Sequence, residues 1–137
     1  MAGFRTVIGR LEKTVIDCPE PRDLAAFYCK ILGMRVNADI EDGAWVVIGT
    51  APGDRELAFQ RVDKWVPPKW PDPEHPQQLH IDIHVSDIAS AEEAVIALGA
   101  RRVPAARETG FHVFLDPVGH PFCLVFGWHP EADTDGN

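Results

Sequence analysis

At residues 79–85 the chain reads Leu-His-Ile-Asp-Ile-His-Val. Apolar and polar residues alternate without interruption, which is typical of a β-strand with one face in the core. In such a strand the aliphatic residues share one face, and the opposite face carries a carboxylate between two imidazoles, namely His80, Asp82 and His84. This composition suits a cavity for a small polar molecule or a metal better than an apolar core.

This strand opens a pattern of one strand, one helix and three more strands. The helix is predicted to begin at Ser86 or Asp87 and to end at Gly99, because apolar residues recur at helical spacing between them. Segments rich in β-branched and aromatic residues, separated by turn signals, then predict strands at 101–106, 111–115 and 121–126.

The first half of the chain shows the same order. A strand is predicted at 11–17, a helix from Pro21 to Gly33, and three strands at 34–40, 45–48 and 56–62. The halves also align in residues, since Ile31-Leu32-Gly33 corresponds to Ala97-Leu98-Gly99. The repeat predicts two similar βαβββ modules, each too small to bury its sheet face alone.

The modules are expected to pair into a single domain over residues 1–137. Module one covers 11–62 and module two covers 79–128, with a polar tail at 129–137. The connection at 63–78 has no periodicity and contains five prolines, with Trp65 and Trp70 among them. Such a segment is a linker or a loop that covers a site, and the tryptophans favour a packed segment.

Composition restricts the class of partner. A formal net charge of −8 argues against nucleic acid or an anionic membrane, so a small molecule is the expected partner. The N-terminal residues lack the apolar core of a signal peptide, and the three cysteines lack C-x-x-C spacing, which predicts a cytoplasmic protein with reduced thiols.

The sequence resembles the vicinal oxygen chelate superfamily, the glyoxalase, bleomycin resistance and dioxygenase group. The resemblance covers residues 11–128 and rests on the duplicated βαβββ order and on two motifs, Phe27-Tyr28-x-x-Ile31-Leu32-Gly33 and Asp116-Pro117-Val118-Gly119. It is similar above all to the glyoxalase-like subgroup, through Phe59-Gln60-Arg61-Val62, Trp70-Pro71-Asp72-Pro73, His80-Ile81-Asp82 and Gly119-His120-Pro121-Phe122-Cys123.

This resemblance implies an α+β fold in which the two modules form a cup-shaped mixed sheet with helices outside. It also implies a homodimer. Metal-dependent members bind a divalent ion through His and Glu side chains at four positions, which fall here on Lys13, His80, Cys123 and Gln60, or Ala58 in place of Gln60. Because this set lacks carboxylates and includes a lysine, an intact family metal site is not expected, and the cofactor stays unknown.

The residues of the strand at 79–85 are the candidate catalytic groups. His80 is expected to act as a general acid or base, with Asp82 and His84 assisting, because a carboxylate orients an imidazole that titrates near neutral pH. The alternative is a solvated face with histidines bonded to backbone carbonyls. If a metal binds, His80 with His84 or Asp82 would hold it.

A second set of side chains is expected to contact the ligand. Lys13 would bind an anionic group or pair with Asp82, and Gln60 would donate or accept hydrogen bonds in the cavity. Cys123 would be a nucleophile if a neighbouring cation or imidazole lowered its pKa, and otherwise a core residue. The remaining candidates are aromatic residues that line a cup or only the core, namely Trp45, His112 and Phe114.

Three functions are compatible with these residues. The first is a lyase or isomerase that acts on a small molecule without the four-ligand metal site. The second is a non-catalytic drug-binding protein of the bleomycin resistance type, with an acidic and aromatic cavity. The third is a metal-dependent lyase or dioxygenase with a rearranged site.

Overall fold

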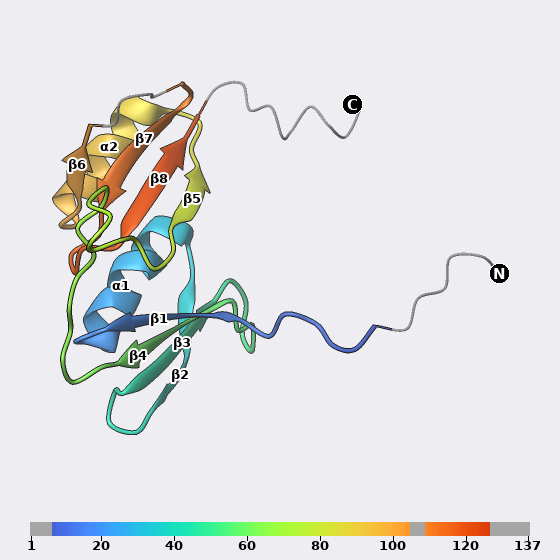
Figure 1. The fold of residues 1–137 in the computed structure, drawn as a ribbon. Helices are drawn as coiled ribbons and strands as arrows, with labels where there is room; N and C mark the ends of the chain where they lie inside the picture. The colour runs from blue at the N-terminus through green and yellow to red at the C-terminus, as the bar shows by residue number, and fades with distance from the viewer. Residues whose placement is uncertain (1–6, 105–108, 127–137) are drawn as a thin grey trace. The chain divides into compact units, whose positions relative to one another are not determined.

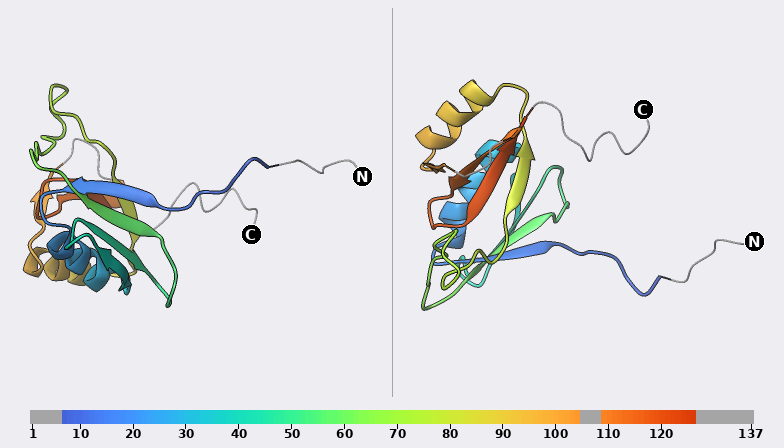
Figure 2. Two further views of the ribbon diagram at one scale, coloured as in Figure 1. Left: turned by 90° about the horizontal axis from the view of Figure 1, so that it is seen from below. Right: turned by 45° about the horizontal axis from the view of Figure 1, so that its top comes forward.

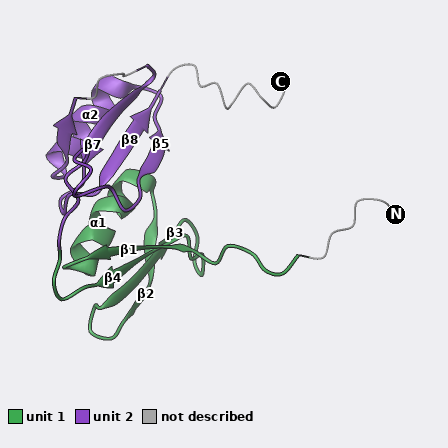
Figure 3. Ribbon diagram, viewed as in Figure 1, with its two compact units in different colours: residues 1–65 green, residues 66–137 purple. Residues whose placement is uncertain are grey.

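A computed structural model describes residues 7–104 and 109–126. The chain divides into two compact units, residues 1–65 and residues 66–137 (Figure 3). Each unit has the order βαβββ with one four-stranded mixed sheet, so the predicted α+β class and the predicted repeat are confirmed (Figure 1).

The first unit contains one helix and four strands. Its elements are β1 (Thr14–Cys18), α1 (Pro21–Leu32), β2 (Arg35–Ile40), β3 (Trp45–Gly49) and β4 (Leu57–Arg61). The sheet order is β1-β4-β3-β2, with β1 parallel to β4 and the other neighbours antiparallel. The helix begins with Pro21 and ends at Gly33, whose φ of 67° is the left-handed conformation that glycine adopts without strain.

The second unit repeats this arrangement. Its elements are β5 (Ile81–His84), α2 (Ile88–Ala97), β6 (Arg101–Val103), β7 (Phe111–Leu115) and β8 (Pro121–Val125). The sheet order is β5-β8-β7-β6, and β5 runs parallel to β8. Asp87 caps α2, because its carboxylate accepts hydrogen bonds from the backbone N–H groups of Ala89 and Ser90.

In each unit the helix packs on one face of its own sheet (Figures 1 and 2). In the first unit Tyr28 of α1 stacks on Phe59 of β4, with ring centroids 5.8 Å apart. In the second unit the helix-facing side of the sheet includes Phe114 and Phe122, both fully buried and stacked at 5.6 Å. These faces form the cores, since burial of large aromatic side chains stabilises a small unit most.

Two predicted strands are shorter in the structure, for identifiable reasons. β1 starts at Thr14 and not at residue 11, because its partner β4 begins only at Leu57, opposite Thr14. β5 starts at Ile81, which lies opposite Phe122 of β8. One residue earlier, the pairing would place His80 opposite Pro121, and proline has no backbone N–H to donate to the ladder. His80 therefore lies immediately before β5 and not within it.

The connection at 63–78 contains no helix or strand, as predicted. Its second part is held by backbone hydrogen bonds from the N–H of Lys69 to the carbonyl of His75, 2.8 Å, and from the N–H of Asp72 to the carbonyl of Lys69, 2.7 Å. Pro68 is buried, whereas most other residues of the connection are exposed. The predicted strand residues 105–106 and the predicted tail at 129–137 lie outside the described residues.

No helix in the described part of the chain is both long and apolar enough to cross a membrane.

Candidate functional site

The face of the second sheet opposite α2, here called the helix-free face, carries the polar residues of β5. Strand pairing places Asp82 beside Cys123 of β8, and His84 beside Val125, so these side chains share this face. Ile83 points to the other face and is buried. The alternation predicted from the sequence is therefore present, with β5 at one edge of the sheet.

His80 and Asp82 form a close pair on this face. The Nε2 atom of His80 lies 3.3 Å from Oδ1 of Asp82, and the two side chains are 42% and 56% exposed. If the Nε2 atom of His80 carries the proton, the carboxylate of Asp82 can orient the imidazole and Nδ1 is left with its lone pair. This is the arrangement of an oriented general base that solvent or a substrate can reach.

Cys123 completes a cluster of three residues with this pair. Burial, the negative charge of Asp82 and a hydrogen bond from the thiol to Asp82 raise the pKa of Cys123 to about 11. A thiol with this pKa stays protonated at neutral pH, and a protonated thiol is a poor nucleophile. The condition set for an activated cysteine, a pKa lowered by a neighbouring cation or imidazole, is therefore not met here.

The three residues of this cluster also offer a set of metal ligands. One donor atom from each of His80, Asp82 and Cys123 lies within 4.8 Å of the other two. Nitrogen, oxygen and sulfur donors together suit a borderline-soft ion such as zinc or cobalt. The sequence pointed to His80 and Asp82, but Cys123 joins them only through the pairing of β5 with β8.

The other predicted residues of this unit do not join the cluster. His84 shares the helix-free face and is exposed, yet the described residues contain no hydrogen bond between it and His80 or Asp82. His112 and Phe114 lie on the opposite face, because they pair with Leu124 and Phe122. His112 contacts Glu92 of α2 through Nδ1, on the face opposite Asp82, and a role for it in ligand binding stays a prediction.

In the first unit three predicted binding residues share one face of the sheet. Gln60 pairs with Trp45 across β3 and β4, and the Nζ of Lys13 lies 5.8 Å from the centre of the Trp45 ring. The Lys13 side chain is 15% exposed and lies 3.8 Å from Glu12. That these residues bind a ligand stays a prediction.

The metal set implied by the family resemblance does not fit these residues. At one of its positions Lys13 offers an ammonium that contacts Glu12 and the Trp45 ring, and Gln60 offers only a neutral amide. A cation has no lone pair to give a metal ion, and nickel, manganese or iron prefer imidazole and carboxylate ligands. The set of three in the second unit shares His80 and Cys123 with these positions and adds Asp82.

Sequence reasoning missed a pocket in the second unit. It measures about 520 Å³ and lies between the connection and the turn that precedes β8. The lining includes Lys69 and Arg101, which no motif had singled out. The only signal in the sequence was the proline-rich composition of residues 63–78, which suggested a loop covering a site.

Comparisons with known proteins agree with the fold. The sequence model of the glyoxalase-like domain matches residues 13–125. A search of curated proteins found no match.

Three similar solved structures illustrate the likeness. A glyoxalase/bleomycin resistance protein/dioxygenase family enzyme from Burkholderia phytofirmans PsJN has a TM-score of 0.62 at 17% identity, covering 84% of this chain and 96% of that one. The fosfomycin resistance protein FosX from Listeria monocytogenes has a TM-score of 0.64 at 17% identity, covering 91% and 98%. FosX from Mesorhizobium loti has a TM-score of 0.61 at 18% identity, covering 93% and 98%.

Proposed function

Since this chain belongs to the glyoxalase-like domain family of the vicinal oxygen chelate superfamily, we propose that it is a small-molecule enzyme of the lyase or isomerase type. The proposal rests on one observation, the 3.3 Å distance between Nε2 of His80 and Oδ1 of Asp82. The thiol of Cys123 lies beside this pair. The reaction is proton transfer at a carbon next to a carbonyl, the step for which an oriented imidazole is suited.

In the proposed step Nδ1 of His80 accepts the proton from carbon. The electron pair of the broken C–H bond moves into the carbonyl, which becomes an enolate. Asp82 accepts the Nε2–H bond throughout, so it fixes the tautomer before the step and stabilises the imidazolium after it. The imidazolium then returns a proton to the same or a neighbouring atom.

Cys123 has a supporting part in this proposal. Its thiol donates a hydrogen bond to Asp82 and stays neutral at pH 7, because the pKa is raised to about 11. The carboxylate is then held by two donors, the thiol and the imidazole N–H. Cys123 is therefore a positioning residue in this proposal, and His80 is the catalytic one.

Deuterium exchange tests the proposal without knowledge of the natural substrate. A panel of pyruvate, acetoacetate, dihydroxyacetone and lactaldehyde is incubated with the protein in D₂O, and loss of the C–H signal is followed by proton NMR. We expect accelerated exchange for at least one compound, and a loss of about 10²- to 10⁴-fold in His80→Gln, the usual contribution of a general base. His75→Gln, which changes a histidine of the connection that contacts Asp72, is the control.

A second readout is independent of any substrate. Long-range nitrogen–proton NMR of the imidazoles distinguishes the two tautomers, and we expect His80 to carry its proton on Nε2 in the wild type but not exclusively in Asp82→Asn. Unchanged exchange in His80→Gln, or a wild-type His80 protonated on Nδ1 alone, would contradict the proposed role. Undiminished affinity in His80→Gln for a compound that wild-type protein binds without exchange would favour the drug-binding alternative.

A metal-dependent enzyme is the second candidate, supported by the three donor atoms within 4.8 Å of one another. When bound, the ion would act as a Lewis acid toward a substrate oxygen. Cobalt(II) reports directly on metal binding at these three residues, because a cobalt–thiolate bond gives an intense near-ultraviolet absorption band. Binding of cobalt with that band in the wild type, and without it in Cys123→Ser, would support this candidate over the metal-free one.

A further inference from the structure

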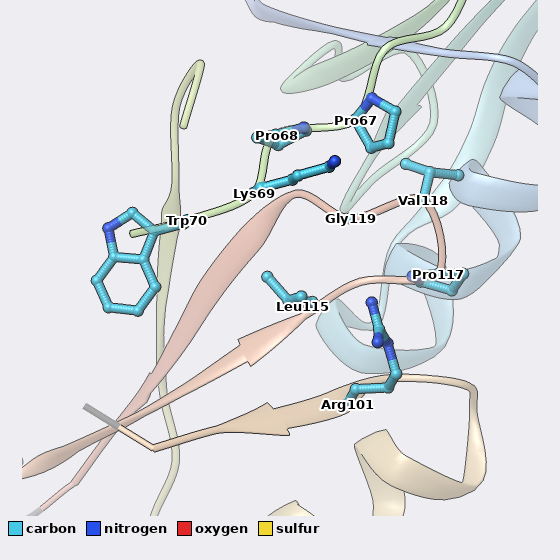
Figure 4. Close-up of a pocket in the computed structure, with 9 residues that line it drawn as sticks. All are labelled: Pro67, Pro68, Lys69, Trp70, Arg101, Leu115, Pro117, Val118 and Gly119. Carbon is cyan, nitrogen blue, oxygen red and sulfur yellow. The ribbon is translucent and has the colours of Figure 1, made fainter. Parts of the chain in front are cut away.

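A pocket in the second unit is lined by residues from three separate segments. They come from the connection, from the start of β6 and from the end of β7 with the turn after it, namely Pro67, Pro68, Lys69, Trp70, Arg101, Leu115, Pro117, Val118 and Gly119. Figure 4 shows these side chains around a common space of about 520 Å³. Neither the fold nor the proposed chemistry of His80 requires this pocket.

The charged residues of the lining are all cations. Lys69 and Arg101 line the pocket, and none of the nine lining residues is acidic, in a chain whose formal net charge is −8. Neither side chain forms an ion pair with any carboxylate in the ranges 7–104 and 109–126. Both extend toward the turn at Pro117–Gly119 in Figure 4, from opposite sides of the space.

The walls of the pocket are held in place by close contacts. Gly119 has a φ of +104°, and a Cβ atom built on it would lie 3.1 Å from Cβ of Pro67. The connection therefore lies directly against the turn, at a distance that only glycine allows without a shift. Backbone hydrogen bonds from the N–H of Lys69 to the carbonyl of His75, and from the N–H of Asp72 to the carbonyl of Lys69, fix the base of the Lys69 side chain.

Two carboxylates near the pocket do not form ion pairs with its cations. Asp72 is close enough to Lys69 for that positive charge to contribute to the lowering of its pKa, but the described residues contain no ion pair between them. Asp116 is buried, and its Oδ1 accepts the backbone N–H groups of Val118 and His120, 3.0 Å each. Its charge is thus directed into the turn and not into the pocket. The same bonds occupy those two amides, so recognition of a ligand falls to the side chains.

The rest of the lining is apolar. Leu115 and Val118 are half-buried, and prolines contribute further non-polar surface. We propose that this pocket binds a small organic anion, with a carboxylate or phosphate group between Lys69 and Arg101 and a non-polar body against Leu115 and Val118. Two cations near an oxyanion provide charge-assisted hydrogen bonds, and apolar contact adds affinity that the head group alone lacks.

This pocket is separate from the His80 cluster. None of its nine lining residues belongs to the cluster of His80, Asp82 and Cys123. Binding to the pocket is therefore tested without reference to catalysis.

The test compares binding of benzoate and phenyl phosphate with that of the neutral benzyl alcohol. Chemical-shift changes at the backbone amides of Val118 and Gly119 locate the site, and titration gives the dissociation constants. We expect both anions to shift these amides and to bind at least tenfold more tightly than benzyl alcohol. Raising the ionic strength from 0.01 to 0.15 M should weaken the binding of the two anions but not that of benzyl alcohol, since salt screens exposed charges.

Charge variants identify the residues. The affinity for benzoate should fall about fivefold in Lys69→Gln and in Arg101→Gln, which is the effect of removing one exposed charge from an ion pair. Lys69→Arg should retain binding, and Lys30→Gln, which makes the same charge change on α1, should leave it unchanged. Equal affinity for benzyl alcohol, unchanged binding in both glutamine variants, or inorganic phosphate binding as tightly as phenyl phosphate would overturn the proposal.

Discussion

Replacing Asp82 with asparagine is expected to lower the pKa of Cys123. Three causes raise this pKa from 9.0 to about 11, and burial is the largest of them. The other two are the negative charge of Asp82 and the hydrogen bond that the thiol donates to it, and the variant removes the charge. Because burial persists, we expect the pKa to fall by about one pH unit, which at pH 8 is about a tenfold rise in thiolate.

Alkylation by iodoacetamide measures this change. The pH at half-maximal rate reports the pKa of the thiol. The experiment uses a Cys29→Ala background, because Cys29 is half-buried and could also react, whereas Cys18 is fully buried. A thiolate of lower pKa is also a weaker nucleophile, with a Brønsted coefficient of about 0.4 to 0.5, so the rate at pH 8 should rise only about threefold.

Glu93→Gln is the matched control for this experiment. It removes one negative charge from the exposed side of α2 and should leave the Cys123 profile unchanged. A midpoint that stays at about 11 or rises in Asp82→Asn would refute the reasoning, because it would mean that Asp82 does not act on Cys123. The cluster that supports the proposed function would then lack the contact between Asp82 and Cys123.

Three further predictions concern stability and are measured by urea denaturation. Because the folded protein binds the Cys123 proton more tightly than the unfolded chain, stability should fall as the pH rises from 9 to about 11, and this fall should be smaller in Cys123→Ser. Phe59→Ala should cost about 3 to 5 kcal/mol, since it removes a fully buried ring stacked on Tyr28, and a loss below about 1 kcal/mol would contradict the described core. Asp87→Ala should cost about 1 kcal/mol through loss of the α2 cap, whereas Asp87→Asn should recover most of it.

Sequence periodicity predicted the local structure well. The alternation at residues 79–85 and the helical spacing before Gly33 and Gly99 depend on neighbours in the chain, and so they can be read without tertiary information. Strand ends were less accurate, because a strand stops where its partner stops. β1 and β5 begin late for that reason, at Thr14 and Ile81.

The candidate site was predicted in part. His80 and Asp82 are two residues apart, so their proximity could be predicted from the sequence, although β5 begins only after His80. For His112 the sequence left a cup-lining and a core position open, and its pairing with Leu124 places it against α2. A shift of one residue in register reverses the face, which is why sequence alone did not decide it.

The sequence by itself determined the repeated βαβββ order, the acidic balance of the chain and the polar face of the strand at 79–85. Only the tertiary structure decided that Cys123 lies beside Asp82 with a raised pKa, and that Lys69 and Arg101 share a pocket. The physical reason is distance along the chain. Periodicity acts over a few residues, whereas burial, strand register and the convergence of charges arise from segments that only folding brings together.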